Sequence, residues 1–299
     1  MKMFNLPNVT NEKVDLGDVE INYFRVGTRK EQTVLLIHGW PETSYAWRKV
    51  APLLADYDLI IPDLRGLGGS STPAAGYDKK TLAHDLVRLV LEHLSVKSLF
   101  VVGHDWGGVV AFFVAAELGR RCLGLTVFDV TVPGSPSINF SQDGRRWHHR
   151  FNQQEGLAEA LVTGRERTFM TWFYENYGAK PGVIDPDAVD QYMKSYSISS
   201  RLPASFAYYR TIEDDVRNAK SVRIDVPVLA LGGADSYGRG EECVASLKDY
   251  AADVQGGSIA ACGHWIPEEQ PEIVADRLQE FFSYCLGKGA IDRNNSVRV

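Results

Sequence analysis

The sequence has 299 residues, of which 44% are hydrophobic and 23% charged, so the chain can bury a sizeable core without disulfides or metal ions. Its formal net charge of −6 argues against nucleic acid or an anionic membrane as a partner. The four cysteines are far apart and form no CxxC or Cys/His ligand spacing, which favours reduced thiols over disulfides or a metal site.

The first half of the chain alternates between predicted strands and helices, which is the order of a parallel sheet with right-handed crossovers. Residues 1–17 lack the continuous apolar stretch of a signal peptide or a membrane helix, so we expect a cytoplasmic protein. Residues 13–26 alternate in polarity and predict a β-hairpin of outer strands. Apolar residues at helical spacing predict helices over 82–94 and 106–121. Four apolar runs are typical of strands buried on both faces of a sheet: 33–39, 57–63, 98–104 and 123–130.

A long segment in the middle of the chain contains no run that resembles a buried strand. Residues 131–215 are rich in aromatic and charged side chains. Helical patterns within them predict an inserted helical cap with helices at 157–177, 186–196 and 204–217.

The core is expected to resume after this segment with a strand, a helix, a weaker strand and a last helix: 226–233, 240–250, 253–260 and 270–286. The residues after 286 have little to bury, so we expect a loose tail. These patterns divide the chain into a first core part (1–131), a cap (132–215) and a second core part (216–299).

One short motif lies where a predicted strand turns into a predicted helix. Gly103-His104-Asp105-Trp106-Gly107 has the small-x-nucleophile-x-small pattern of a nucleophile elbow, in which the flanking glycines let strand and helix approach closely. The central residue, Asp105, then projects at the edge of the sheet. The motif alone leaves open a simpler reading, since Asp is also a common N-cap of helices.

Four motifs in order extend this observation: HGWP (38–41), DLRGLGGS (63–70), GHDWGG (103–108) and GHW (263–265). Together they resemble the epoxide hydrolase and dehalogenase branch of the α/β-hydrolase superfamily, over about residues 18–286. The resemblance implies an α/β-hydrolase fold, with a mostly parallel eight-stranded sheet flanked by helices and an inserted helical cap. It also implies a cis proline at Pro41, and neither a cofactor nor a metal ion.

The residue at the elbow decides which chemistry is expected. A carboxylate can displace a leaving group from an sp3 carbon, so Asp105 would form an alkyl ester with the substrate. His264 follows the last predicted strand, where this fold carries its catalytic histidine, and would activate water to hydrolyse that ester. The backbone N–H groups of Trp40 and Trp106 would form the oxyanion hole.

Two residues compete for the role of the acid that orients His264. Asp129 ends a predicted strand 24 residues after Asp105, as in relatives that carry the acid after the sixth strand. Asp235 follows the next predicted strand, but Ser236 aligns better with the acid of the alternative branch. We favour Asp129, since Asp235 lies in a Gly-Ala-Asp-Ser segment typical of a turn.

The leaving oxygen of an epoxide needs a proton donor from the cap, because ring opening produces an alkoxide. The segment SFAYYR (205–210) resembles the lid motif that places a phenol before an arginine, which selects Tyr209. The segment RWHHRF (146–151) resembles the second lid position and selects His148, with His149 as a rival. The other aromatic hydroxyls of the cap are expected to serve packing: Tyr174, Tyr177, Tyr192, Tyr196 and Tyr208.

These residues predict an epoxide hydrolase that opens a small apolar epoxide to a vicinal diol, with a homodimer as the oligomer to test for. A haloalkane-type dehalogenase is the first alternative: Trp106 is present, but Trp40 replaces the Asn that usually helps to hold the halide. Fluoroacetate dehalogenases carry two arginines where Trp106 and Val109 stand. A non-catalytic receptor on the same fold is disfavoured by the intact set Asp105, Asp129 and His264, because binding needs no base.

Overall fold

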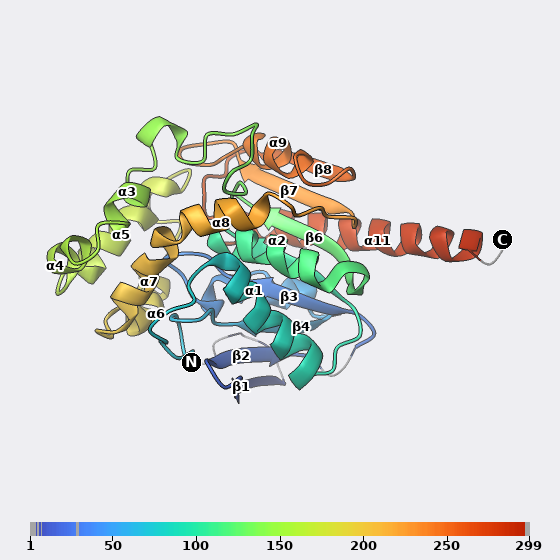
Figure 1. Cartoon of the computed structure of the whole chain (residues 1–299), viewed down its shortest axis with the longest axis horizontal. Helices are drawn as coiled ribbons and strands as arrows, with labels where there is room; N and C mark the ends of the chain where they lie inside the picture. Colours follow the sequence, from blue (N-terminus) through green and yellow to red (C-terminus); the bar gives the residue numbers. More distant parts are fainter. Residues whose placement is uncertain (1–3, 5, 7, 28–29, 297–299) are drawn as a thin grey trace.

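The computed structural model describes residues 4, 6, 8–27 and 30–296, with side chains as far as Lys288. Eight strands form one sheet in the order β1-β2-β4-β3-β5-β6-β7-β8 (Figure 1). Strand β2 is antiparallel to both of its neighbours and the other five pairs are parallel, which confirms the predicted mostly parallel sheet and the outer hairpin. The strands are β1 (Val9–Asp15), β2 (Glu20–Val26), β3 (Thr33–Ile37), β4 (Asp58–Pro62), β5 (Leu99–His104), β6 (Cys122–Phe128), β7 (Val228–Gly233) and β8 (Val254–Ile259).

Helices cover both faces of this sheet and bury its apolar runs. Every residue of β3, β4, β5 and β7 is buried, as expected of strands covered on both faces. One core cluster includes residues of α1 (Lys79–Arg88), α2 (Trp106–Leu118) and α9 (Glu242–Lys248), and the other includes residues of α10 (Ile266–Glu269) and α11 (Pro271–Ser296). Short 3-10 or π turns lie at Ser44–Arg48, Ala51–Leu54, Leu89–His93, Gly119–Arg121 and Gln142–Gly144.

Six helices lie between β6 and β7, and all but the last stand beyond one end of the sheet, whereas the last returns towards α1 and α2 (Figure 1). The predicted helix 157–177 is two helices, because Gly164 adopts a φ of +77° between them. The boundary predicted between residues 215 and 216 falls inside the last of the six, which continues to Ala219. These helices are α3 (His148–Asn152), α4 (Leu157–Val162), α5 (Glu166–Tyr177), α6 (Pro186–Tyr196), α7 (Arg201–Arg210) and α8 (Ile212–Ala219).

A buried ion pair joins these inserted helices to the core. Lys79, on α1, places Nζ 2.8 Å from Oδ2 of Asp215 on α8, and neither side chain is exposed. The same ammonium group lies 3.9 Å from the centre of the Trp106 ring, in a cation–π contact. Separating the two side chains would leave each charge buried without a partner, which is strongly unfavourable. The ion pair therefore holds α8 against α1.

The prediction of a loose tail after residue 286 is wrong as far as Ser296, where α11 ends (Figure 1), and residues 297–299 lie outside the described part of the chain. A helix satisfies its backbone hydrogen bonds internally, and no proline interrupts 272–296, so the backbone stays helical where the helix leaves the sheet. Within the described part of the chain, no helix is both long and apolar enough to cross a membrane. All four cysteines are free and buried.

Candidate active site

Asp105 lies at the turn between β5 and α2 with φ +51° and ψ −129°, a conformation that L-residues rarely adopt. The neighbouring glycines explain how this turn can form. A Cβ on Gly103 would overlap the backbone of Gly107, and a Cβ on Gly107 would overlap the carbonyl of His38. The strand, the helix and the loop after β3 therefore meet without side chains between them, which is the close approach that the glycine spacing predicts.

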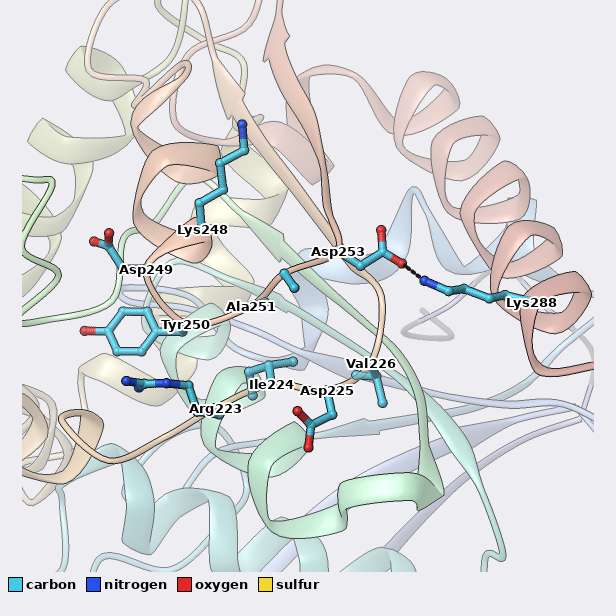
Figure 2. Close-up of a pocket in the computed structure, with 11 residues that line it drawn as sticks. Arg223, Ile224, Asp225, Val226, Lys248, Asp249, Tyr250, Ala251, Asp253 and Lys288 are labelled. Carbon is cyan, nitrogen blue, oxygen red and sulfur yellow. Dashed lines mark hydrogen bonds and ion pairs between the residues drawn. The ribbon is translucent and has the colours of Figure 1, made fainter. Parts of the chain in front are cut away.

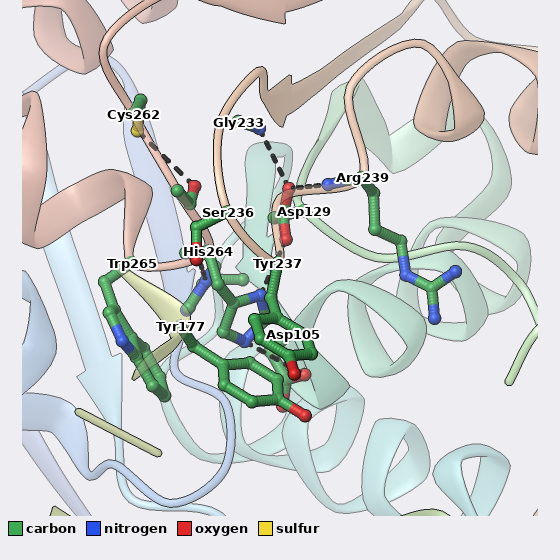
Figure 3. A network of polar contacts seen from close by, with 12 residues as sticks. Asp105, Asp129, Tyr177, Gly233, Ser236, Tyr237, Arg239, Cys262, His264 and Trp265 are labelled. Carbon is green, nitrogen blue, oxygen red and sulfur yellow. Dashed lines mark hydrogen bonds and ion pairs between the residues drawn. The ribbon is translucent and has the colours of Figure 1, made fainter. Parts of the chain in front are cut away.

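The structure brings Asp105, His264 and Asp129 together at the carboxyl ends of three strands (Figure 3). The Nδ1–H of His264 donates to Oδ2 of Asp129 at 2.6 Å. Its Nε2 lies 3.5 Å from Oδ2 of Asp105. The second oxygen of Asp129 accepts from the backbone N–H groups of Gly233, at 2.9 Å, and Arg239, at 2.7 Å.

The two candidate acids have opposite environments. Asp129 is fully buried, whereas Asp235 is exposed in the turn after β7. Burial by itself would raise the pKa of Asp129, but the hydrogen bond and the electrostatic interaction with His264 outweigh it and lower that pKa. Asp129 is therefore a carboxylate at neutral pH, bonded to the nitrogen of His264 that faces away from Asp105.

The loop after β3 contributes a donor beside the carboxylate of Asp105. The backbone N–H of Trp40 donates to Oδ1 of Asp105 at 2.9 Å. Gly39 permits this approach, since a Cβ there would lie 2.5 Å from the Cβ of Asp105. The peptide bond between Trp40 and Pro41 is cis, as the resemblance implies. Trp106 is the first residue of α2, so its N–H belongs to the helix N-terminus next to Asp105.

Aromatic side chains of the inserted helices cover this group. The ring centre of Tyr209 lies 5.2 Å from Trp40, 5.3 Å from Trp106 and 5.5 Å from His148. Burial, followed by the negative charge of Asp105, raises the pKa of Tyr209 well above its usual value, so the phenol keeps its proton. The structure thus brings the two predicted lid residues, Tyr209 and His148, to one place above Trp40.

His148 and His149 are both buried, and burial lowers the pKa of each well below its usual value. His148 stacks on Trp40 with ring centres 5.7 Å apart and planes at 5°. His149 stacks on Phe140, and its Nδ1 lies 3.1 Å from Oγ of Ser141. The face-to-face contact with Trp40, whose N–H reaches Asp105, makes His148 the better candidate of the two.

Comparisons with known proteins agree with this geometry. A family model described as alpha/beta hydrolase fold matches residues 32–271. The soluble epoxide hydrolase of Corynebacterium sp. (strain C12) is 31% identical over 288 residues, covering 92% of this chain and 98% of that protein. The fluoroacetate dehalogenase of Burkholderia sp is 30% identical, covering 90% of this chain and 92% of that protein. The solved structure of the epoxide hydrolase CorEH without ligand has a TM-score of 0.84 at 30% identity, covering 92% of this chain and 99% of that chain.

The chain belongs to the alpha/beta hydrolase fold family. It is a hydrolase of the epoxide hydrolase branch, which is related to dehalogenases. The fold class and the family inferred from the sequence motifs are confirmed.

Sequence reasoning missed a buried pair of side chains next to Asp105 and the His264 loop of this hydrolase. The imidazole of His104 lies 3.0 Å from Oε2 of Glu42 through Nδ1, and 2.7 Å from the carbonyl oxygen of His264 through Nε2. Burial opposes a charge on His104, but the hydrogen bond to Glu42 and the charges of Glu42 and Asp105 raise its pKa to about 9. Both ring nitrogens therefore donate at neutral pH, and His104 holds the His264 loop against the elbow.

Tyr177, which the sequence pattern assigned to packing, also contacts the loop that carries His264. Its carbonyl oxygen accepts from the backbone N–H of His264 at 2.9 Å. A Cβ on Gly263 would lie 2.5 Å from that same oxygen, so the loop and the end of α5 are in direct backbone contact. A buried aromatic in an amphipathic helix gives no sequence signal that separates such a contact from ordinary packing.

The raised pKa of His104 predicts a pH dependence of stability. Because the pKa in the folded state exceeds the unfolded value of about 6.5, the contribution of His104 is present in full below that pH. It is lost as pH rises through about 9. The loss should be on the order of 3 kcal/mol in the free energy of unfolding, by the linkage between pKa shift and stability.

Urea titrations at several pH values between 6 and 10 would measure this loss. The variant His104→Asn cannot titrate, so its stability should fall less steeply over the same range. Parallel curves for the two proteins would show that His104 is not charged in the folded state.

A cavity of about 530 Å³ lies at the opposite end of the sheet, before β7 and β8 (Figure 2). Its charged lining includes Arg223, Lys248 and Lys288 together with Asp225 and Asp253. Lys288 is already paired with Asp253 at 2.5 Å. None of the residues brought together around Asp105 lines this cavity.

Proposed function

We propose that this hydrolase opens small apolar epoxides to vicinal diols through an alkyl ester on Asp105. The observation that carries the proposal is a carboxylate, rather than a hydroxyl or thiol, at the nucleophile elbow. Oδ2 of this carboxylate lies 3.5 Å from Nε2 of His264, whose Nδ1 is hydrogen-bonded to Asp129. The similarity to the soluble epoxide hydrolase of Corynebacterium supports the same assignment.

In the first half-reaction, an oxygen of Asp105 attacks a ring carbon of the epoxide and the bond from that carbon to the ring oxygen breaks. A carboxylate needs no deprotonation, so His264 takes no part in this step. The departing oxygen takes the proton of the Tyr209 phenol, which the raised pKa keeps protonated at neutral pH. The products are an ester on Asp105 whose alkyl group carries a free hydroxyl on the adjacent carbon, and the phenolate of Tyr209.

In the second half-reaction, Nε2 of His264 takes a proton from water and the oxygen adds to the ester carbonyl of Asp105. The N–H groups of Trp40 and Trp106 stabilise the oxyanion that forms. Asp129 stabilises the imidazolium through the 2.6 Å hydrogen bond. When the intermediate collapses, the bond from the carbonyl carbon to the alkyl oxygen breaks, and that oxygen takes the proton from His264 as the diol leaves. The acid proton that remains on Asp105 then passes to the Tyr209 phenolate, which restores both residues.

The aromatic surroundings favour an apolar substrate. The residues around Tyr209 and His148 include Trp40, Trp106 and Phe173, all of them buried. We propose that the cap (132–215) supplies the aromatic cover of the site and the two residues that contact the departing oxygen, Tyr209 and His148. The core supplies the nucleophile and the base.

Replacing Tyr209 with phenylalanine tests the role of its hydroxyl, since the ring and its packing are kept. We expect formation of the ester from styrene oxide or epichlorohydrin to slow by about 10²–10⁴-fold, the range of general acid catalysis. Tyr208→Phe is a matched control, because the Tyr208 hydroxyl donates to the carbonyl of Arg65 in the core. Equal rates for Tyr209→Phe and wild type would remove Tyr209 from the mechanism.

The same assays separate the epoxide from a halide as leaving group. The similarity to a fluoroacetate dehalogenase makes this comparison necessary. Bromide release from 1-bromobutane should be weak or absent. Fast bromide release together with no diol from any epoxide would falsify the proposed function.

A further inference from the structure

A hydrogen bond inside the cap links two aromatic residues that belong to different helices. The Tyr177 hydroxyl, at the end of α5, lies 3.1 Å from Nδ1 of His148, the first residue of α3. Both side chains are buried. The Tyr177 ring also stacks on Tyr237, with centres 4.1 Å apart and planes at 8°, so the hydroxyl is held in place (Figure 3).

The protonation states of the two groups follow from their surroundings. Burial lowers the pKa of His148 well below its usual value, and the positive charges of Arg146 and Arg239 lower it further. His148 is therefore neutral, with one ring nitrogen as donor and the other as acceptor. Burial raises the pKa of Tyr177, so this phenol keeps its hydrogen.

The chemistry of the pair decides which group donates. An unprotonated imidazole nitrogen is a strong acceptor, while a phenol is a better donor than acceptor. The favourable arrangement is therefore O–H of Tyr177 donating to Nδ1 of His148, and the single hydrogen of the imidazole then resides on Nε2.

The plane of the imidazole is fixed as well. His148 lies flat on Trp40, at 5°, and meets the edges of Phe173 and Tyr209 at 71° and 80°. Among the residues that the structure describes, His148 forms its side-chain hydrogen bond through Nδ1, to the Tyr177 hydroxyl, and Nε2 forms none. The N–H is thus an oriented donor that is left for another molecule.

We propose that Tyr177 is a positioning residue that holds His148 as its Nε2–H tautomer, so that His148 donates a hydrogen bond to the leaving oxygen beside Tyr209. This inference rests on the proposed epoxide hydrolysis. The division of roles is strict: Tyr209 gives up its proton, and His148 keeps its own and stabilises the developing negative charge.

Tyr177→Phe tests the proposal because it removes only the hydroxyl. The bond from His264 to the Tyr177 carbonyl belongs to the backbone and is unaffected. We expect ester formation to slow by about 10-fold, the worth of one hydrogen bond. The later hydrolysis of the ester should keep its rate. Tyr237→Phe is the matched control, since it removes a hydroxyl from the ring stacked on Tyr177.

A second measurement reads the tautomer without any turnover. Nitrogen NMR of ¹⁵N-histidine-labelled protein, with the His148 signals assigned from a His148→Gln variant, should show hydrogen on Nε2 in the wild type. In Tyr177→Phe the Nδ1–H form should appear. Hydrogen on Nδ1 in the wild type, or an unchanged rate of ester formation in Tyr177→Phe, would overturn the proposal. Failure of the wild type to open any epoxide would instead reject the proposed function, and the NMR result would still stand by itself.

Discussion

His264→Gln should stop turnover and leave the protein esterified on Asp105. The carboxylate attacks carbon without help from a base, so the first half-reaction needs neither nitrogen of His264. Water, by contrast, must lose a proton to attack the ester, and Nε2 of His264 is the nitrogen 3.5 Å from Asp105. The second half-reaction is therefore blocked while the first continues.

Intact-mass spectrometry after incubation with a small epoxide should show one added substrate mass. Peptide mapping should locate it in the segment that contains Asp105. The double variant Asp105→Ala/His264→Gln is the control and should stay unmodified. If His264→Gln binds the epoxide but gains no mass, either the nucleophile is another group or water opens the ring directly.

Asp129→Asn should lower kcat by orders of magnitude, while Asp235→Asn should stay close to wild type. The Asp129 carboxylate accepts the Nδ1–H of His264 and so presents the other nitrogen, unprotonated, towards Asp105. An amide at this position can turn its NH₂ group towards the histidine and select the wrong tautomer, which costs about 10⁴-fold in a comparable triad. Asp235 is exposed and lies on a turn that faces solvent.

Single-turnover kinetics of the two variants would show where the loss occurs. For Asp129→Asn it should fall on hydrolysis of the ester, since His264 acts in that step. Circular dichroism should show an unchanged fold, because the amide oxygen can still accept from Gly233 and Arg239. The opposite ranking of the two variants would transfer the role to Asp235.

The sequence was sufficient to predict the fold and the elbow, and the reasons are local. Parallel strands that are buried on both faces are mostly apolar, as in 98–104, and such runs are visible without a structure. The glycines at 103 and 107 are required because no Cβ fits where the strand, helix and loop meet. The strand order puts both Asp129 and Asp235 shortly after a strand, and the choice of Asp129 came from the family resemblance and from the turn-like sequence around Asp235.

Other parts of the site depend on contacts that no local pattern encodes. Tyr177 and His148 lie 29 residues apart, and Glu42 and His104 lie 62 residues apart. The residues of each pair come into contact only when the helices and loops pack together, so neither residue can be assigned its partner from the sequence. The end of α11 was mispredicted because the prediction relied on burial. A helix can continue on its own backbone hydrogen bonds where it has no surface to cover.

The contact between Gly263 and the backbone of Tyr177 has a consequence for how substrate enters. Because the end of α5 and the loop that carries His264 touch without side chains between them, the position of that loop depends directly on the position of α5. A displacement that opened the cap at this edge would carry His264 away from Asp105. If substrate enters by such a displacement, His264 can act on the ester of the proposed mechanism only after the cap has returned to its place over Asp105.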